Sequence, residues 1–81
     1  MYYVYVLRSE KDGRLYKGLT FDLEKRLSQH NAGITKSTKG YRPWSIVYFE
    51  KFNTRIEARE REKFFKTGQG RDYLKKIITA A

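Results

Sequence analysis

Apolar and polar side chains recur with two different periods along this chain, and the change of period predicts where strands and helices lie. Residues 2–7 are rich in tyrosine and valine, and residues 15–19 resume as a strand-like segment after an Asp-Gly turn signal. These two segments predict a β-hairpin. Residues 44–52 alternate apolar and polar side chains and predict a third strand. On a regular strand, one face would carry Trp44, Ile46, Tyr48 and Glu50, and the other would carry Val47, Phe49 and Lys51.

A helix is predicted between the hairpin and the third strand. Thr20 or Asp22 can cap its start, it runs through Gln29, and the Asn-Ala-Gly stretch at residues 31–33 is suited to ending it. Residues 33–43 then form a polar, basic segment without apolar periodicity, which predicts a loop. We expect this loop to face the substrate.

Two further helices are predicted in the last third of the chain. Thr54 can cap a helix over residues 55–66, which Gly68 and Gly70 are expected to break. A short helix over residues 72–78 follows. Together the elements predict an α/β (α+β) fold, in which a small three-stranded antiparallel sheet, the hairpin plus the third strand, is flanked by about three helices.

Length and composition limit what this fold can be. The chain has 81 residues, which supports a single domain over residues 1–81, and its twelve Phe and Tyr residues plus Trp44 suit a compact aromatic core. The absence of cysteine excludes a disulfide framework and thiolate zinc sites. No apolar run approaches the length of a membrane span, and no signal-peptide pattern opens the chain. We therefore expect a soluble, cytoplasmic protein with no membrane partner.

The charge of the chain indicates a polyanionic partner. Eighteen Lys and Arg residues outnumber nine acids, and no acid occurs between Glu24 and Glu50. Such a one-signed segment creates a positive field that concentrates nucleic acid before any specific contact forms. We expect DNA or RNA as the partner, whereas docking to an acidic protein is permitted by the charge alone. The cations of this segment are Lys25, Arg26, Lys36, Lys39 and Arg42.

The predicted helix after the hairpin gathers two chemically active side chains. Leu23, Arg26, Leu27 and His30 fall at i, i+3, i+4 and i+7 and therefore share one face. Arg26 and His30 thus lie beside the apolar stripe. Taken alone, such a pair is more often a snorkelling arginine and a hydrogen-bonded, partly buried histidine than a catalytic site.

Glu62 is a second polar group on a buried face. It shares the inward side of its helix with Ala58 and Phe65, at spacings of i, i+4 and i+7. An inward carboxylate costs free energy unless a cation or hydrogen bonds satisfy it. Both a metal ion and a salt bridge to Arg26 would meet that need.

The order of these residues along the chain resembles the GIY-YIG nuclease superfamily. The resemblance is carried by Tyr3-Val4-Tyr5 and Tyr16-Lys17-Gly18, followed by Arg26, His30 and Glu62. It is closest to the small stand-alone members, which are similar to the nuclease module of intron homing endonucleases and of the excision-repair incision subunit. Stretches such as Thr35-Lys36-Ser37-Thr38-Lys39-Gly40 are characteristic of those small proteins, and the match extends from residue 2 to about residue 66.

This resemblance implies roles for five residues. Tyr5 and Tyr16 match the two catalytic tyrosines, Arg26 the helix arginine, His30 a position held by His or Tyr, and Glu62 the metal-binding glutamate. The implied reaction is hydrolysis of DNA phosphodiester bonds with one divalent ion, Mg²⁺ or Mn²⁺. The resemblance leaves open whether Tyr5, Tyr16 or His30 orients or deprotonates the attacking water.

The chain departs from the superfamily pattern at three points. Tyr3 replaces the glycine of the first triplet, Lys17 replaces the isoleucine of the second, and no asparagine follows Asn53 where larger members supply one. Lys17 adds a charge that can face solvent or a phosphate. The first substitution is shared in kind by the small stand-alone members.

Two readings of the function follow. In the first, the chain is a nuclease that is structure-selective or exonucleolytic, connected with DNA repair, and dependent on a partner protein for any sequence specificity. In the second, it is an inactive nucleic-acid-binding module, in which Tyr41 or Trp44 stacks on bases. We expect Trp44 to lie in the core because it begins an alternating strand. The cations expected to contact phosphates are Lys17, Lys36, Lys39 and Arg42.

Overall fold

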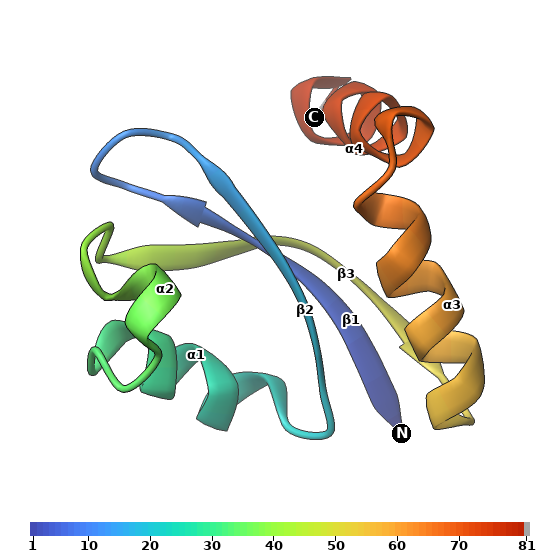
Figure 1. The fold of residues 1–81 in the computed structure, drawn as a ribbon, viewed down its shortest axis with the longest axis horizontal. Coiled ribbons are helices and arrows are strands. Elements are labelled where there is room, and N and C mark those ends of the chain that lie inside the picture. Colours follow the sequence, from blue (N-terminus) through green and yellow to red (C-terminus); the bar gives the residue numbers. More distant parts are fainter. Residues whose placement is uncertain (81) are drawn as a thin grey trace.

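The predicted hairpin and third strand form one antiparallel sheet. In the computed structural model, which describes residues 1–80, β1 (Tyr2–Ser9) is the central strand and pairs with β2 (Leu15–Thr20) and β3 (Trp44–Phe52) (Figure 1). The strand order is therefore β2-β1-β3. The predicted fold class, a three-stranded antiparallel sheet flanked by helices, is confirmed.

The helices cover the two faces of this sheet. Figure 1 shows α1 and α2 on one side and α3 and α4 on the other. Within residues 1–80, no helix is both long enough and apolar enough to cross a membrane. The bounds are Leu23–Asn31 for α1, Lys36–Lys39 for α2, Arg55–Phe65 for α3 and Gly68–Ala80 for α4.

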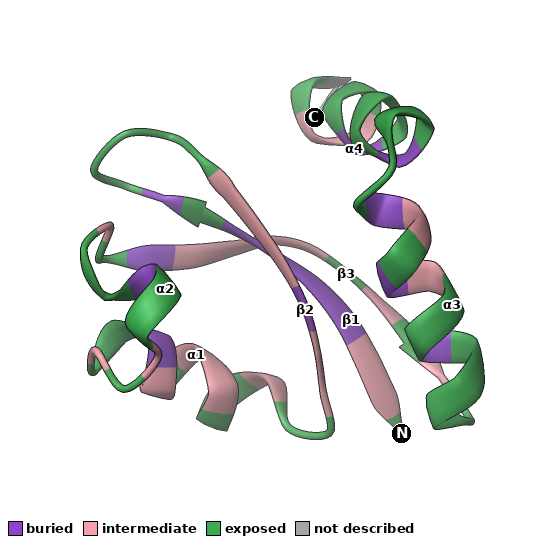
Figure 2. Cartoon of the chain, viewed as in Figure 1, coloured by how far each residue is buried: buried purple, intermediate pink, exposed green. Residues whose placement is uncertain are grey.

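The central strand is buried on both sides, as the purple segment of β1 in Figure 2 shows. Because successive side chains point to opposite faces, Val4 and Val6 pack under α3 and α4, whereas Tyr5 and Leu7 pack under α1. One strand thus supplies two separate clusters. Among the buried members of the two clusters, only those under α1 carry polar side-chain atoms, on Tyr5 and Trp44.

The third strand contains a bulge that regular alternation does not predict. Val47 is the one residue of β3 without a partner in the β1 register, and the register shifts there. An extra residue moves all later side chains to the other face. Trp44 and Ile46 consequently pack under α1, while Tyr48 packs against the cluster under α3. The prediction that these three side chains share one face is wrong.

The helices α1 and α3 each begin directly after a residue that the sequence predicts as their N-terminal cap. Asp22, rather than Thr20, caps α1 by accepting a hydrogen bond from the backbone N–H of Lys25 at 3.1 Å. Thr54 caps α3 and accepts from the backbone N–H of Glu57 at 3.2 Å. Both caps place their helices as the sequence indicates.

Two predicted segment boundaries are wrong. The loop over residues 33–43 contains the short helix α2, and the last helix begins at Gly68 instead of residue 72. Gly70 does not act as a breaker. A Cβ added to it would lie 1.8 Å from the carbonyl oxygen of Phe64, so its missing side chain lets the first turn of α4 pack on the end of α3.

Candidate active site

The hydroxyl of Tyr5 is the centre of a hydrogen-bonded cluster between the sheet and α1. It lies 3.0 Å from Nε2 of His30 and accepts a bond from Nε of Arg26 at 3.3 Å. The spacing of four residues places both partners on the face of α1 that covers Tyr5. The shared face predicted for Arg26 and His30 is therefore present, and it is directed at a catalytic-tyrosine candidate.

His30 is completely buried, and both of its ring nitrogens are engaged. Nδ1 lies 2.8 Å from Oγ1 of Thr38, whose hydroxyl in turn donates to the carbonyl oxygen of Thr35 at 3.3 Å. With Thr38 donating to that carbonyl, the hydrogen-bond network assigns the tautomer in which Nδ1–H donates to Oγ1 and Nε2 accepts the Tyr5 proton. A continuous chain of hydrogen bonds thus links Tyr5 to α2.

Sequence analysis did not single out Thr38 as a site residue. It lies eight residues after His30 in a segment without periodicity, and only the turn of α2 brings it under the imidazole. The indole N–H of Trp44 donates to the carbonyl oxygen of Thr38 at 2.9 Å, which ties this turn to the core. Trp44 is 3% exposed, as expected of a core residue.

Burial sets the protonation of this cluster. Desolvation, assisted by the positive charge of Arg26, lowers the pKa of His30 to about 4. Desolvation also raises the pKa of Tyr5, although its hydrogen bond from Arg26 opposes the shift. At neutral pH the cluster therefore holds a neutral imidazole, a protonated phenol and a charged guanidinium.

Tyr16 and Gly18 on the hairpin complete this side of the sheet. The ring centroid of Tyr16 lies 4.9 Å from that of His30 and 6.4 Å from that of Tyr5. Gly18 is paired directly with Tyr5, and a Cβ added to it would lie 2.4 Å from the Tyr5 hydroxyl. The glycine of the Tyr-Lys-Gly triplet is thus the residue over which the phenol passes.

Glu62 lies on α3, on the other side of the sheet. It is 8% exposed, and its two carboxylate oxygens contact Arg59 at 3.3 Å and Lys66 at 3.2 Å. The alternative salt bridge to Arg26 does not form, because Arg26 bonds to Tyr5 and Gln29 instead. Glu62 makes no direct contact with the Tyr5 cluster, but its negative charge contributes to raising the pKa of Tyr5.

The donor set around Glu62 is compatible with a hydrated Mg²⁺ or Mn²⁺. No group of three or more acidic or imidazole side chains converges anywhere in residues 1–80. A protein cage is therefore not formed, but Mg²⁺ commonly takes one carboxylate and completes its shell with water and substrate phosphate. The two cations on Glu62 are more than half exposed, and such ion pairs are weak enough to exchange.

The four cations expected to contact phosphate are divided between the two sides of the sheet. Lys36, Lys39 and Arg42 lie in or beside α2, where the guanidinium of Arg42 donates to the carbonyl oxygen of Lys39 at 2.8 Å. Lys17 alternates with Gly18 and therefore faces α3 and α4. The other stacking candidate, Tyr41, is covered by Arg14 at 3.5 Å from its ring centroid.

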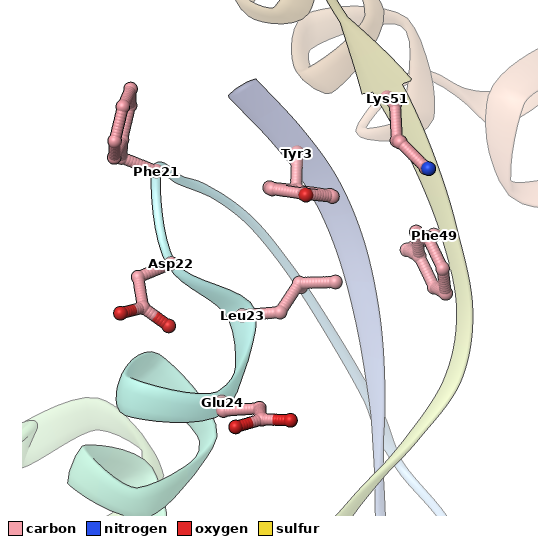
Figure 3. A pocket seen from close by; sticks show the side chains of 7 residues that line it. All are labelled: Tyr3, Phe21, Asp22, Leu23, Glu24, Phe49 and Lys51. Atoms are coloured by element: carbon pink, nitrogen blue, oxygen red, sulfur yellow. The ribbon is translucent and has the colours of Figure 1, made fainter. Parts of the chain in front are cut away.

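A surface hollow lies on the same face of the sheet, beside the start of α1 (Figure 3). It has a volume of about 440 Å³, and Tyr3, Leu23, Phe49 and Lys51 are among its lining residues. Tyr3 precedes Tyr5 by two residues and so points to the same side. The sequence does not predict this hollow, which is formed jointly by β1, β3 and the start of α1.

The sequence is similar to proteins of one family. Residues 1–76 match the GIY-YIG catalytic domain. The chain is 44% identical over 77 residues to a UPF0213 protein of Staphylococcus saprophyticus, covering 94% of this chain and 93% of that protein. It is 48% identical over 67 residues to a UPF0213 protein of Clostridium perfringens, covering 82% of this chain and 71% of that one.

A solved structure shows the same fold. The solution NMR structure of the UPF0213 protein from Bacillus halodurans matches with a TM-score of 0.57 and 31% identity, covering 95% of this chain and 85% of that one. The chain belongs to the GIY-YIG catalytic domain family and, within it, to the UPF0213 proteins.

Proposed function

We propose that this protein hydrolyses DNA phosphodiester bonds in a reaction that depends on one divalent metal ion. The observation that carries the proposal is the Tyr5 hydroxyl, which contacts a guanidinium and a neutral imidazole at once. Arg26 is partly exposed, so its planar fork can also reach a phosphate at the surface. There it neutralises charge that develops on the phosphorus during attack.

Tyr5 and His30 form a proton path in this proposal. Tyr5 takes a proton from the attacking water while its own proton passes to Nε2 of His30. His30 has no exposed surface and Tyr5 only 2%, so the water would meet the Tyr5 hydroxyl beside the partly exposed Arg26 and Tyr16, and His30 would act through Tyr5. A phosphate bound to Arg26 offsets the charge that helps to lower the pKa of His30, which makes the imidazole a better acceptor when substrate is present.

Glu62 is the proposed metal ligand. When bound there, Mg²⁺ or Mn²⁺ would polarise a phosphoryl oxygen and stabilise the leaving oxygen. Arg59 and Lys66 contact the carboxylate through ion pairs whose cations are more than half exposed, and these pairs would give way to the ion. Tyr16 lies beside both Tyr5 and His30 and orients the water in this scheme.

Incubation with labelled single- and double-stranded DNA in Mg²⁺, Mn²⁺ or EDTA tests the proposal. We expect cleavage only with metal, and we expect Glu62→Gln to abolish it while the domain stays folded. Glu60→Gln, an exposed position on the same helix, is the matched control and should cleave normally. Unchanged cleavage by Glu62→Gln would rule out its role as the metal ligand.

Substrate selection in this proposal is structure-selective or exonucleolytic and connected with DNA repair. The described residues hold one small sheet and four helices, with no further element that reads a long DNA sequence. A partner protein would therefore supply any sequence specificity. Cleavage at one defined sequence in a pool of random DNA would overturn this assignment.

One observation favours a binding module as the second candidate function. Both oxygens of Glu62 are held by protein cations, and within residues 1–80 it belongs to no group of three or more acidic or imidazole side chains. If the ion does not displace these partners, the basic surface would bind nucleic acid without cutting it. Salt-sensitive retention of DNA with no cleavage in any metal would select this function.

A further inference from the structure

A groove separates the hairpin from α4 on the side of the sheet opposite the Tyr5 cluster. It has a volume of about 340 Å³, and the cations Arg8 and Lys75 and the apolar side chains of Leu15 and Ile78 line it. Its remaining lining residues are Gly13, Arg14 and Thr79, so no acidic side chain borders it. Arg14 is already engaged with Asp12 at 2.8 Å. The groove therefore combines apolar side chains with two cations that form no salt bridge within residues 1–80.

The positive charge continues from this groove toward Glu62. Lys17 follows Leu15 by two residues on the same side of β2, and Arg71 precedes Lys75 by one turn on α4. Positive charge from Arg71 and Lys66, together with burial, lowers the pKa of Lys17, so these cations lie close to one another. Lys66 in turn contacts Glu62 at 3.2 Å.

The row of cations formed by Arg8, Lys75, Arg71 and Lys17 does not stabilise the fold. Lys17 is half-buried between two leucines that pack into the core, yet it pairs with no carboxylate of residues 1–80. A partly buried charge beside other charges of the same sign opposes folding. Its arrangement is complementary to a row of phosphates, which would supply the missing negative charge.

We propose that the groove between β2 and α4 binds the phosphate backbone of a single DNA strand and leads it toward Glu62. Phosphates contact Arg8, Lys75, Arg71 and Lys17 in turn, and sugars lie on Leu15. The size of the groove is that of a small-ligand site, which suits one strand instead of a duplex. DNA as the ligand rests on the proposed function, but binding here does not require that the protein cuts it.

The test measures binding in EDTA, where metal-dependent cleavage does not occur. The probe is a fluorescein-labelled oligothymidylate of about 20 nucleotides, followed by anisotropy at several salt concentrations. Lys75→Glu is compared with Lys76→Glu, which makes the same charge change at an exposed neighbour that does not line the groove. We expect Lys75→Glu to weaken binding about tenfold and to reduce the salt slope, and Lys76→Glu to weaken it less than about threefold.

Equal losses in the two variants would overturn the groove, because they would show an effect of net charge alone. A second variant, Lys17→Met, removes a charge from the row while keeping the length of the side chain. We expect it to melt at the same temperature as the parent protein or higher and still to bind the probe more weakly. Unchanged affinity of Lys17→Met would exclude Lys17 from the strand's path. Tighter binding of a duplex of the same length would overturn the single-strand assignment.

Because this assay contains no metal, its outcome separates the groove from the nuclease. Binding that discriminates between Lys75→Glu and Lys76→Glu supports the groove even if no substrate is ever cleaved. Cleavage that persists unchanged in Lys75→Glu, with unchanged affinity, overturns the groove and leaves the proposed function standing.

Discussion

The two faces of the sheet differ in what their buried side chains do. Under α3 and α4, the buried residues of the core cluster are all apolar, and Phe65 and Leu74 have no exposed surface. Under α1, burial is equally complete, but Tyr5, His30 and Thr38 bond to one another through polar atoms. The first face holds the fold together by removing apolar area from water. The second uses the same burial to fix protonation states.

The central strand allows a short chain to form both an apolar core and a polar site. β1 serves both faces because its side chains alternate, so one central strand holds the two halves in register. Every buried polar side-chain atom in residues 1–80 has a hydrogen-bond partner, which removes the usual cost of burying such a site. The comparison predicts that substitutions in the apolar cluster under α3 and α4 change stability, and that substitutions in the polar cluster under α1 change activity.

The largest expected effect is on stability, from Phe65→Ala. Phe65 is fully buried beneath α4 and packs with Tyr48 and Tyr73, so truncation removes apolar contacts and leaves a cavity. We expect the free energy of unfolding to fall by about 4 kcal/mol. Urea denaturation measures it. A loss below about 1 kcal/mol would show that this face is not the stabilising one.

Arg26→Ala should give the next largest effect, and on activity instead. Arg26 is partly exposed and donates to Tyr5, so its loss leaves no large cavity but removes the proposed phosphate contact. We expect the cleavage rate to fall about a hundredfold, with a melting temperature close to that of the parent protein. Lys25→Ala removes the same charge from an exposed neighbour and should cleave normally. Equal losses of cleavage rate in both variants would show that net charge, and not the position of Arg26 beside Tyr5, controls activity.

The parts of the structure that the sequence predicts are those governed by local rules. Alternation and turn chemistry place the hairpin, capping places α1 and α3, and helical periodicity places Arg26 and His30 on one face. Each depends on residues only a few positions apart. The resemblance to the GIY-YIG family adds the pairing of these residues with Tyr5 and Tyr16.

The parts that the sequence does not predict depend on contacts between distant segments. The bulge at Val47 arises where β3 pairs with β1, and nothing within residues 44–52 announces it. Thr38 reaches His30 only because α2 turns back on α1. Gly70 looks like a breaker in sequence, but tertiary packing on Phe64 keeps it within a helix.

The pH dependence of the free energy of unfolding tests whether the polar cluster under α1 keeps His30 neutral. The pKa of His30 is about 4 in the fold and about 6.5 when exposed, so the unfolded chain binds more protons between these values. The part of the folding free energy that depends on a neutral His30 is fully present above about pH 6.5 and is lost as the pH falls toward 4. We expect unfolding to become easier by about 2 kcal/mol between pH 7 and pH 5. His30→Gln lacks this titration, and an equally steep loss in that variant would contradict it.

The smallest expected effect is the most specific, because it concerns one hydrogen bond behind the site. Thr38→Val keeps the shape of the side chain but leaves Nδ1–H of the buried His30 without an acceptor. The imidazole would then favour the tautomer that donates to Tyr5, which blocks the proposed proton path. We expect the maximal cleavage rate to fall about tenfold with little change in KM, whereas Thr38→Ser restores the acceptor and should recover most of the rate. Equal cleavage rates of Thr38→Val and Thr38→Ser would contradict the transfer of a proton from Tyr5 to His30. That transfer requires the tautomer with a proton on Nδ1, which the serine hydroxyl stabilises and the valine methyl group does not.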